Sequence, residues 1–128
     1  MITELTYLLY AAILLIVHML VQATLSDLSK GISWALGPQD EARAQNAVAG
    51  RVDRALRNYV YNFPAFISLA LLLAVTESNT ANTALGAMLW FWARVAYVPA
   101  YASGLPLLRS VAWFASLAGL AMMAWPLI

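Results

Sequence analysis

Apolar residues occur along this chain in four long runs, separated by links of unequal length and polarity. The runs extend over about Leu5–Leu25, Tyr59–Val75, Ala81–Tyr101 and Leu107–Ile128. A helix rises about 1.5 Å per residue, so roughly 20 apolar residues cross a hydrocarbon core of about 30 Å. The pattern therefore predicts an all-α membrane protein whose four helices form a transmembrane bundle.

Composition favours lipid as the solvent for most of the surface. Of the 128 residues, 63% are hydrophobic and only 10% are charged, whereas soluble domains carry roughly 25% charged residues. We therefore expect a single transmembrane domain over residues 1–128. The first apolar run is too long for a signal peptide and no basic region precedes it, so we expect it to be retained.

Net charge and cysteine content argue against several classes of function. The formal net charge is only +1, so nucleic acid is not an expected partner. The chain has no cysteine, which excludes disulfides, thiolate metal ligands and a cysteine nucleophile. We predict no metal site, and any thiol chemistry must use a thiol that a ligand supplies.

The distribution of Lys and Arg predicts the orientation of the helices. Basic residues gather in the link between the first two runs, which ends in Arg51, Arg54 and Arg57, and Arg109 lies beside the last turn. The second link, Glu77–Asn82, has no Lys or Arg. The positive-inside rule then places both basic links in the cytoplasm and both chain termini on the non-cytoplasmic side.

One stripe of polar side chains lies where the second apolar run begins. Its members are spaced so that they share one face of a helix: Arg54, Arg57, Asn58 and Tyr61. Taken alone, the stripe could be no more than the positively charged cytoplasmic flank of a transmembrane helix. A second stripe changes this interpretation.

The second stripe lies inside the third run, where Arg94, Tyr97 and Tyr101 again share a helix face. An arginine at mid-helix costs roughly 2.5–3.5 kcal/mol on insertion scales and normally faces a partner or a cavity. Arg109 and Ser110 then begin the fourth run, where the helix dipole favours an anion. Arginines, an amide and hydroxyls without an intramembrane carboxylate indicate a site for a small acid.

Three segments carry a resemblance to a known family: Gly50–Pro64, Ala93–Tyr101 and Leu108–Trp113. Together they resemble the MAPEG family, the membrane-associated proteins of eicosanoid and glutathione metabolism, in a bacterial-type member. The resemblance implies a left-handed four-helix bundle, assembled as a homotrimer in the bacterial inner membrane. It also implies that glutathione, as a cosubstrate, binds between neighbouring subunits near the cytoplasmic face.

The resemblance assigns roles to part of the two stripes. Arg57 and Asn58 would contact the carboxylate end of glutathione, and Tyr97 and Tyr101 would line its pocket. The family usually has a glutamate three residues after the asparagine, where it meets the amino group of glutathione. Here that position is Tyr61, whose phenol can accept a hydrogen bond but supplies no negative charge at neutral pH.

The resemblance also implies a mechanism at the start of the fourth run. Arg109 matches the arginine that stabilises the glutathione thiolate, with Ser110 beside it. A free cysteine thiol has a pKa of about 8.5, and an adjacent guanidinium lowers it. The thiolate would attack an apolar electrophile or a peroxide dissolved in membrane lipid, and Trp113 would shape that side of the pocket. The implied activity is that of a glutathione-dependent membrane transferase or peroxidase.

Two other functions remain open. One is a non-enzymatic or differently liganded membrane trimer that keeps this fold, which Tyr61 favours because the usual carboxylate is missing. The other is a small four-span multidrug exporter. Such exporters use a carboxylate embedded in their first span, whereas here Glu4 lies at the very end of the run and His18 occupies its interior.

Overall fold

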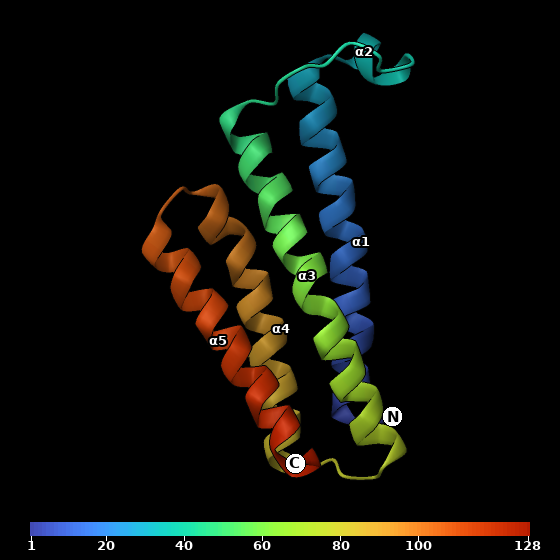
Figure 1. The fold of residues 1–128 in the computed structure, drawn as a ribbon, viewed down its shortest axis with the longest axis vertical. Coiled ribbons are helices and arrows are strands. Elements are labelled where there is room, and N and C mark those ends of the chain that lie inside the picture. The colour runs from blue at the N-terminus through green and yellow to red at the C-terminus, as the bar shows by residue number, and fades with distance from the viewer.

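The computed structural model describes residues 1–128 and is helical throughout, without a strand. Four long helices form the body of the molecule (Figure 1). A short helix lies in the first link and a 3₁₀ turn ends the chain. The elements are, in order, α1 (Thr3–Lys30), α2 (Ile32–Leu36), α3 (Ala47–Val75), α4 (Ala81–Ala102), α5 (Pro106–Ala124) and η1 (Trp125–Leu127).

Three of the four long helices have the length and composition to cross a membrane: α1, α3, and α5 together with η1. The prediction of an all-helical membrane protein is confirmed to this extent. The helix α4 has 22 residues but is not among the three. Asn82, Arg94 and Pro99 lower its mean hydropathy, so its place as a fourth span is not established by composition.

The helix α3 begins well before the apolar run from which it was predicted. It starts at Ala47, after Asn46, whose side chain accepts a hydrogen bond of 2.8 Å from the backbone N–H of Ala49. An asparagine in this position stabilises a helix start because it satisfies a free N–H group. The basic run, with Arg51 and Arg54, is therefore held on a rigid helix and not on a flexible link.

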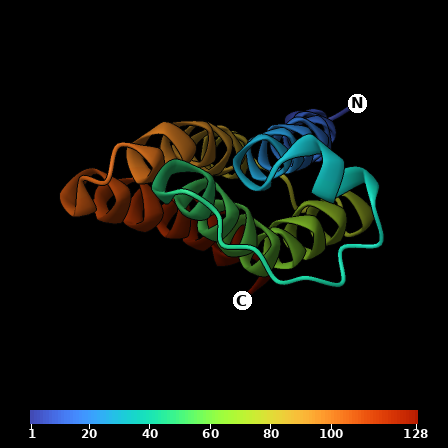
Figure 2. The same cartoon turned by 90° about the horizontal axis from the view of Figure 1, so that it is seen from above.

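The four long helices are arranged as two pairs, α1 with α3 and α4 with α5 (Figures 1 and 2). Glycines permit the close approach of the second pair. A Cβ atom added to Gly86 would lie 2.7 Å from the carbonyl oxygen of Gly119, and one added to Gly119 would lie 2.6 Å from that of Gly86. Small residues at such contacts are typical of helices packed in lipid.

Aromatic side chains join the two pairs near their midpoints. The rings of Phe66 on α3 and Trp90 on α4 stack with centroids 4.0 Å apart, and both are buried. Tyr59 belongs to the same cluster, and its hydroxyl donates a hydrogen bond of 2.6 Å to the carbonyl of Ala11 on α1. Buried phenols usually find such a partner. This cluster fixes α3 and α4 relative to each other below the site.

The two ends of the molecule differ in composition. Both termini and the α3–α4 link lie at one end, whereas α2 and the α4–α5 turn lie toward the other (Figure 1). At the terminal end the hydroxyl of Thr83 donates a hydrogen bond to the carboxylate of Glu4. At the opposite end the two helix pairs diverge, and there the arginines of α3 and α5 are found.

Candidate functional site

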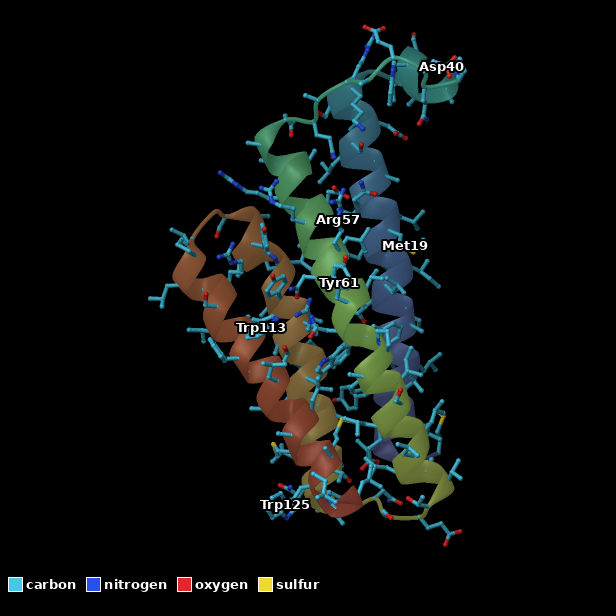
Figure 3. The ribbon with its side chains drawn as sticks, viewed as in Figure 1. Met19, Asp40, Arg57, Tyr61, Trp113 and Trp125 are labelled. Atoms are coloured by element: carbon cyan, nitrogen blue, oxygen red, sulfur yellow. The ribbon has the colours of Figure 1, made fainter.

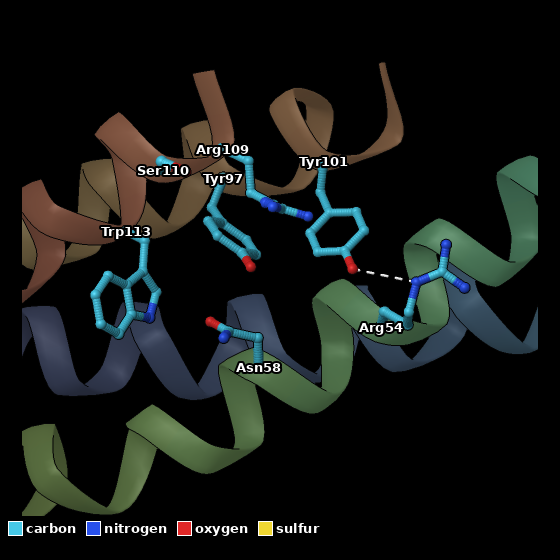
Figure 4. Close-up of a pocket in the computed structure, with 7 residues that line it drawn as sticks. All are labelled: Arg54, Asn58, Tyr97, Tyr101, Arg109, Ser110 and Trp113. Carbon is cyan, nitrogen blue, oxygen red and sulfur yellow. Dashed lines mark hydrogen bonds between the residues drawn. The ribbon is translucent and has the colours of Figure 1, made fainter. Parts of the chain in front are cut away.

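A cavity of about 330 Å³ lies between α3 and the α4–α5 pair. We call it the polar cavity. All of its lining residues were predicted as site residues from the sequence, and they converge from three helices (Figure 4): Arg54, Asn58, Tyr97, Tyr101, Arg109, Ser110 and Trp113. The structure thus brings together the central members of both polar stripes and the start of α5.

Two guanidinium groups from different helices meet on one phenol in this cavity. The Nε of Arg54 donates a hydrogen bond of 3.1 Å to the hydroxyl of Tyr101 (Figure 4). The Cζ atom of Arg109 lies 5.1 Å from the centroid of the same ring, within the range of a cation–π contact. The ion pairs of the structure are Arg43 with Glu41 and Arg57 with Asp53. Arg54 and Arg109 are therefore not neutralised by a carboxylate.

The start of α5 positions the rest of the polar cavity. The helix begins with Pro106, which is well suited to a first helical position because its ring fixes the backbone. Arg109, Ser110 and Trp113 follow within the first two turns of α5 and line the cavity, and Figure 4 shows Trp113 pointing toward α3 and Arg109 toward Tyr101. Free N–H groups and the helix dipole make this end favourable for an anion. An anionic ligand would meet the guanidinium of Arg109 at the same place.

Arg94 lies outside the polar cavity and is buried, with only 1% of its surface exposed. Its Cζ atom is 4.3 Å from the ring centroid of Tyr97 and 5.5 Å from that of Tyr59. None of its three side-chain nitrogens has a hydrogen-bond partner. The sequence predicted that an arginine at this position would face a partner or a cavity, and here its guanidinium packs against two aromatic rings. Of the two rings that Arg94 contacts, only that of Tyr97 also lines the polar cavity.

The first polar stripe is divided by the structure. Arg54 and Asn58 line the cavity, whereas Arg57 pairs with Asp53 at 3.1 Å and Tyr61 is 84% exposed. Figure 3 labels Arg57 and Tyr61 on α3. The four stripe positions spread over about 100° of the helix circumference, so only the side toward α4 faces the cavity. Within one chain, the four residues do not surround one ligand.

A second cavity of about 280 Å³ adjoins the first and shares Arg54, Tyr101 and Arg109 with it. Arg51 and the α4–α5 turn complete its lining. Sequence reasoning treated Arg51 only as part of a charged flank. Its spacing of three residues from Arg54 was the available signal, because that spacing puts both side chains on one face of a helix. We call this space the outer cavity.

An apolar groove of about 560 Å³ lies on a different face of the α4–α5 pair. Its lining is mostly hydrophobic and includes Ala96, Ala100, Leu108 and Val111. It shares no residue with the polar cavity. The pair of helices therefore separates a polar space, on the side of α3, from an apolar one.

The fold and the site define a helical membrane protein with an open, arginine-lined cavity between its helices. Comparison with known protein families identifies the particular family. The chain belongs to the MAPEG family, whose model matches residues 7–128. The family resemblance inferred from three sequence segments is thus confirmed. Members of the family are generally glutathione-associated membrane trimers. No curated protein matches the chain.

Proposed function

We propose that this protein is a glutathione-dependent transferase or peroxidase of the bacterial inner membrane. The observation that carries the proposal is the pair of guanidinium groups, Arg54 and Arg109, that share a cavity without a neutralising carboxylate. Uncompensated guanidiniums in a membrane protein favour an anionic ligand. Family membership makes glutathione, which has two carboxylates and a thiol, the ligand with the best support.

The residues of the polar cavity suit different parts of that ligand. Arg54 offers a planar fork to a carboxylate, and Asn58 adds an amide beside it. Arg109, with Ser110, is assigned to the sulfur, where a guanidinium favours the thiolate over the thiol. Each unit by which the thiol pKa falls corresponds to about 1.36 kcal/mol. The thiolate sulfur then bonds to a carbon of an apolar electrophile, and the leaving group departs with its electron pair.

We propose that the protein works as a homotrimer of four-span subunits with glutathione held between neighbours. The exposure of Arg57 and Tyr61 supports this assembly, because both were implied to contact glutathione and neither faces the cavity of its own chain. A neighbouring subunit beside α3 would bring that face of α3 against a shared ligand. The close packing of α4 along α5 supports α4 as the fourth span.

The proposed orientation has both termini on the non-cytoplasmic side and the polar cavity near the cytoplasmic face. It rests on the basic residues at the α2 end of the molecule. Reporter fusions at Asn79 and after Ile128 should report the non-cytoplasmic side, and a fusion near Gln45 the cytoplasm. A cytoplasmic C-terminus would overturn the orientation and the location of the site.

Calorimetric titration of the detergent-purified protein with glutathione tests ligand and site together. The native protein should bind, and Arg54→Gln should bind at least tenfold more weakly, since a charge-assisted hydrogen bond contributes about 1.5–3 kcal/mol. Arg43→Gln is the matched control, because it removes the same charge from a residue outside the cavity. Equal weakening in both variants would reject the polar cavity as the binding site.

A differently liganded, non-enzymatic trimer is the second candidate. It is favoured by one observation: no acidic residue lines the polar cavity or the outer cavity, so neither offers a carboxylate to the ammonium group of glutathione. In that case the native protein would give no heat with glutathione and would not conjugate it to an apolar electrophile. Binding together with conjugation would eliminate this candidate.

A further inference from the structure

The outer cavity gathers three guanidinium groups at the end of the α4–α5 pair. Arg51 and Arg54 come from α3 and Arg109 from α5. None of the three forms an ion pair within the chain. Like charges that line one cavity repel each other, and no carboxylate of the chain pairs with them, so a bound anion would relieve the repulsion. Of the three, Arg51 belongs to the outer cavity alone.

Arg51 is held in place by the turn that joins α4 to α5. Its Nη1 donates a hydrogen bond of 3.3 Å to the carbonyl of Ala102, the last residue of α4. Gly104 follows with φ +77°, and a Cβ atom added there would lie 3.0 Å from the Cζ of Arg51. Glycine adopts this positive φ without strain, and without a side chain it lets the guanidinium of Arg51 lie against the turn. The turn and the arginine therefore form one fitted unit.

Arg54 and Arg109, the other two arginines of the outer cavity, are both oriented by contacts with Tyr101. Tyr101 accepts the hydrogen bond from Arg54, and its ring lies beneath the guanidinium of Arg109. Each guanidinium has five N–H donors in a rigid fork, so most of the donors of these arginines remain free. Leu105 and Pro106, at the start of α5, also line this cavity.

We propose that Arg51, Arg54 and Arg109 form a phosphate-binding subsite that is distinct from the glutathione position in the polar cavity. One guanidinium fork is enough for the two oxygens of a planar carboxylate, whereas three guanidiniums from two helices can approach a tetrahedral phosphate group from several sides. The subsite lies where transmembrane helices end, which is the level of phospholipid headgroups. A lipid phosphate and a soluble phosphate ester share this chemistry.

The subsite has a consequence for the proposed reaction, and this part of the inference rests on the proposed function. Arg54 and Arg109 line both cavities. A phosphate that engages them from the outer side competes with glutathione for the same donors. Anionic lipid should therefore weaken glutathione binding to the native protein, and it should have little effect on Arg51→Gln.

Native mass spectrometry of the detergent-purified protein tests the subsite without glutathione, so its failure is separable from failure of the proposed function. The probes are phosphatidylglycerol, zwitterionic phosphatidylcholine and inorganic phosphate. The native protein should retain phosphatidylglycerol in preference to phosphatidylcholine, and Arg51→Gln should reduce that retention about tenfold. Arg43→Gln, which removes the same charge outside both cavities, should retain the lipid as the native protein does.

Three variants and three probes give each outcome a meaning. Binding of inorganic phosphate without phosphatidylglycerol, lost in Arg51→Gln, supports a soluble phosphate ester as the ligand. If Arg51→Gln does not fold, Arg51→Lys should still retain less lipid than the native protein, because a point charge replaces the fork. Equal retention by Arg51→Lys and the native protein, equal losses in Arg51→Gln and Arg43→Gln, or binding of neither phosphatidylglycerol nor inorganic phosphate would overturn the proposal.

Discussion

Arg109 and Arg94 carry the same charge on adjacent helices, but their surroundings are opposite. Arg109 lines a cavity, keeps its donors free and lies beside the ring of Tyr101. Arg94 is enclosed by Tyr97 and Tyr59, and no acceptor reaches its nitrogens. A guanidinium group with free donors in a cavity can bind a ligand, whereas an enclosed guanidinium group can interact only with the side chains around it. The comparison separates the proposed ligand-binding arginine from a structural one.

The largest expected effect is on catalysis at Arg109. Arg109→Gln should lower conjugating activity roughly 100-fold, the loss typical when one group that stabilises a developing or bound anion is removed. Arg109→Lys should retain an intermediate activity, since a point charge replaces a planar fork. Turnover of an apolar electrophile with glutathione measures both. Native activity in Arg109→Gln would eliminate this residue as the activating group.

A smaller effect, on stability, is expected at Arg94. Arg94→Met should preserve the Tm in detergent or raise it, with a gain in the free energy of unfolding of up to roughly 2 kcal/mol. The reason is that a buried unpaired guanidinium has a large desolvation cost, which contacts with aromatic rings offset only in part. Arg94→Ala is the comparison variant and should lower the Tm, because it also removes the packing of the side-chain stem.

A marked loss of stability in Arg94→Met would contradict this account of Arg94. It would indicate that the guanidinium has a partner in the assembled protein, and the contrast with Arg109 would no longer hold.

The smallest expected effect concerns Tyr61, which replaces the family's usual glutamate. Tyr61→Glu should bind glutathione about tenfold more tightly, because it restores a charge-assisted bond to the ligand's ammonium and about 1.4 kcal/mol is one decade. Calorimetry with a glutathione analogue that lacks the amino group is the control, and its affinity should change little. Equal weakening of both ligands would place Tyr61 away from the amino-group subsite.

The sequence predicted much of the site because helical spacing determines which residues share a face. Asn58, Tyr97, Tyr101 and Arg109 were selected by spacing and charge, and the structure collects them in one cavity. Spacing does not report how far a face extends toward a neighbouring helix. Tyr61 projects between Arg54 and Arg57 around the helix, so its exposure depends on which helices pack beside that part of α3 and could not be predicted from spacing.

Other features depend on the packing between helices, which the pattern along one helix does not contain. The enclosure of Arg94 by rings from α3 and α4 is one example. The fit of Arg51 to Gly104 across the α4–α5 turn is another. The early start of α3 was missed for a different reason, since hydropathy marks the apolar run and not the helix that carries it.

The central claim is that the polar cavity holds glutathione as a thiolate beside Arg109. Its most direct test is a pH titration of the ultraviolet absorbance of the bound thiolate in the native protein and in Arg109→Gln. The native protein should show a thiol pKa at least one unit below the value of about 8.5 for a free cysteine thiol, and the variant should return to about 8.5. A pKa of 8.5 or above for glutathione that calorimetry shows to be bound would contradict the claim.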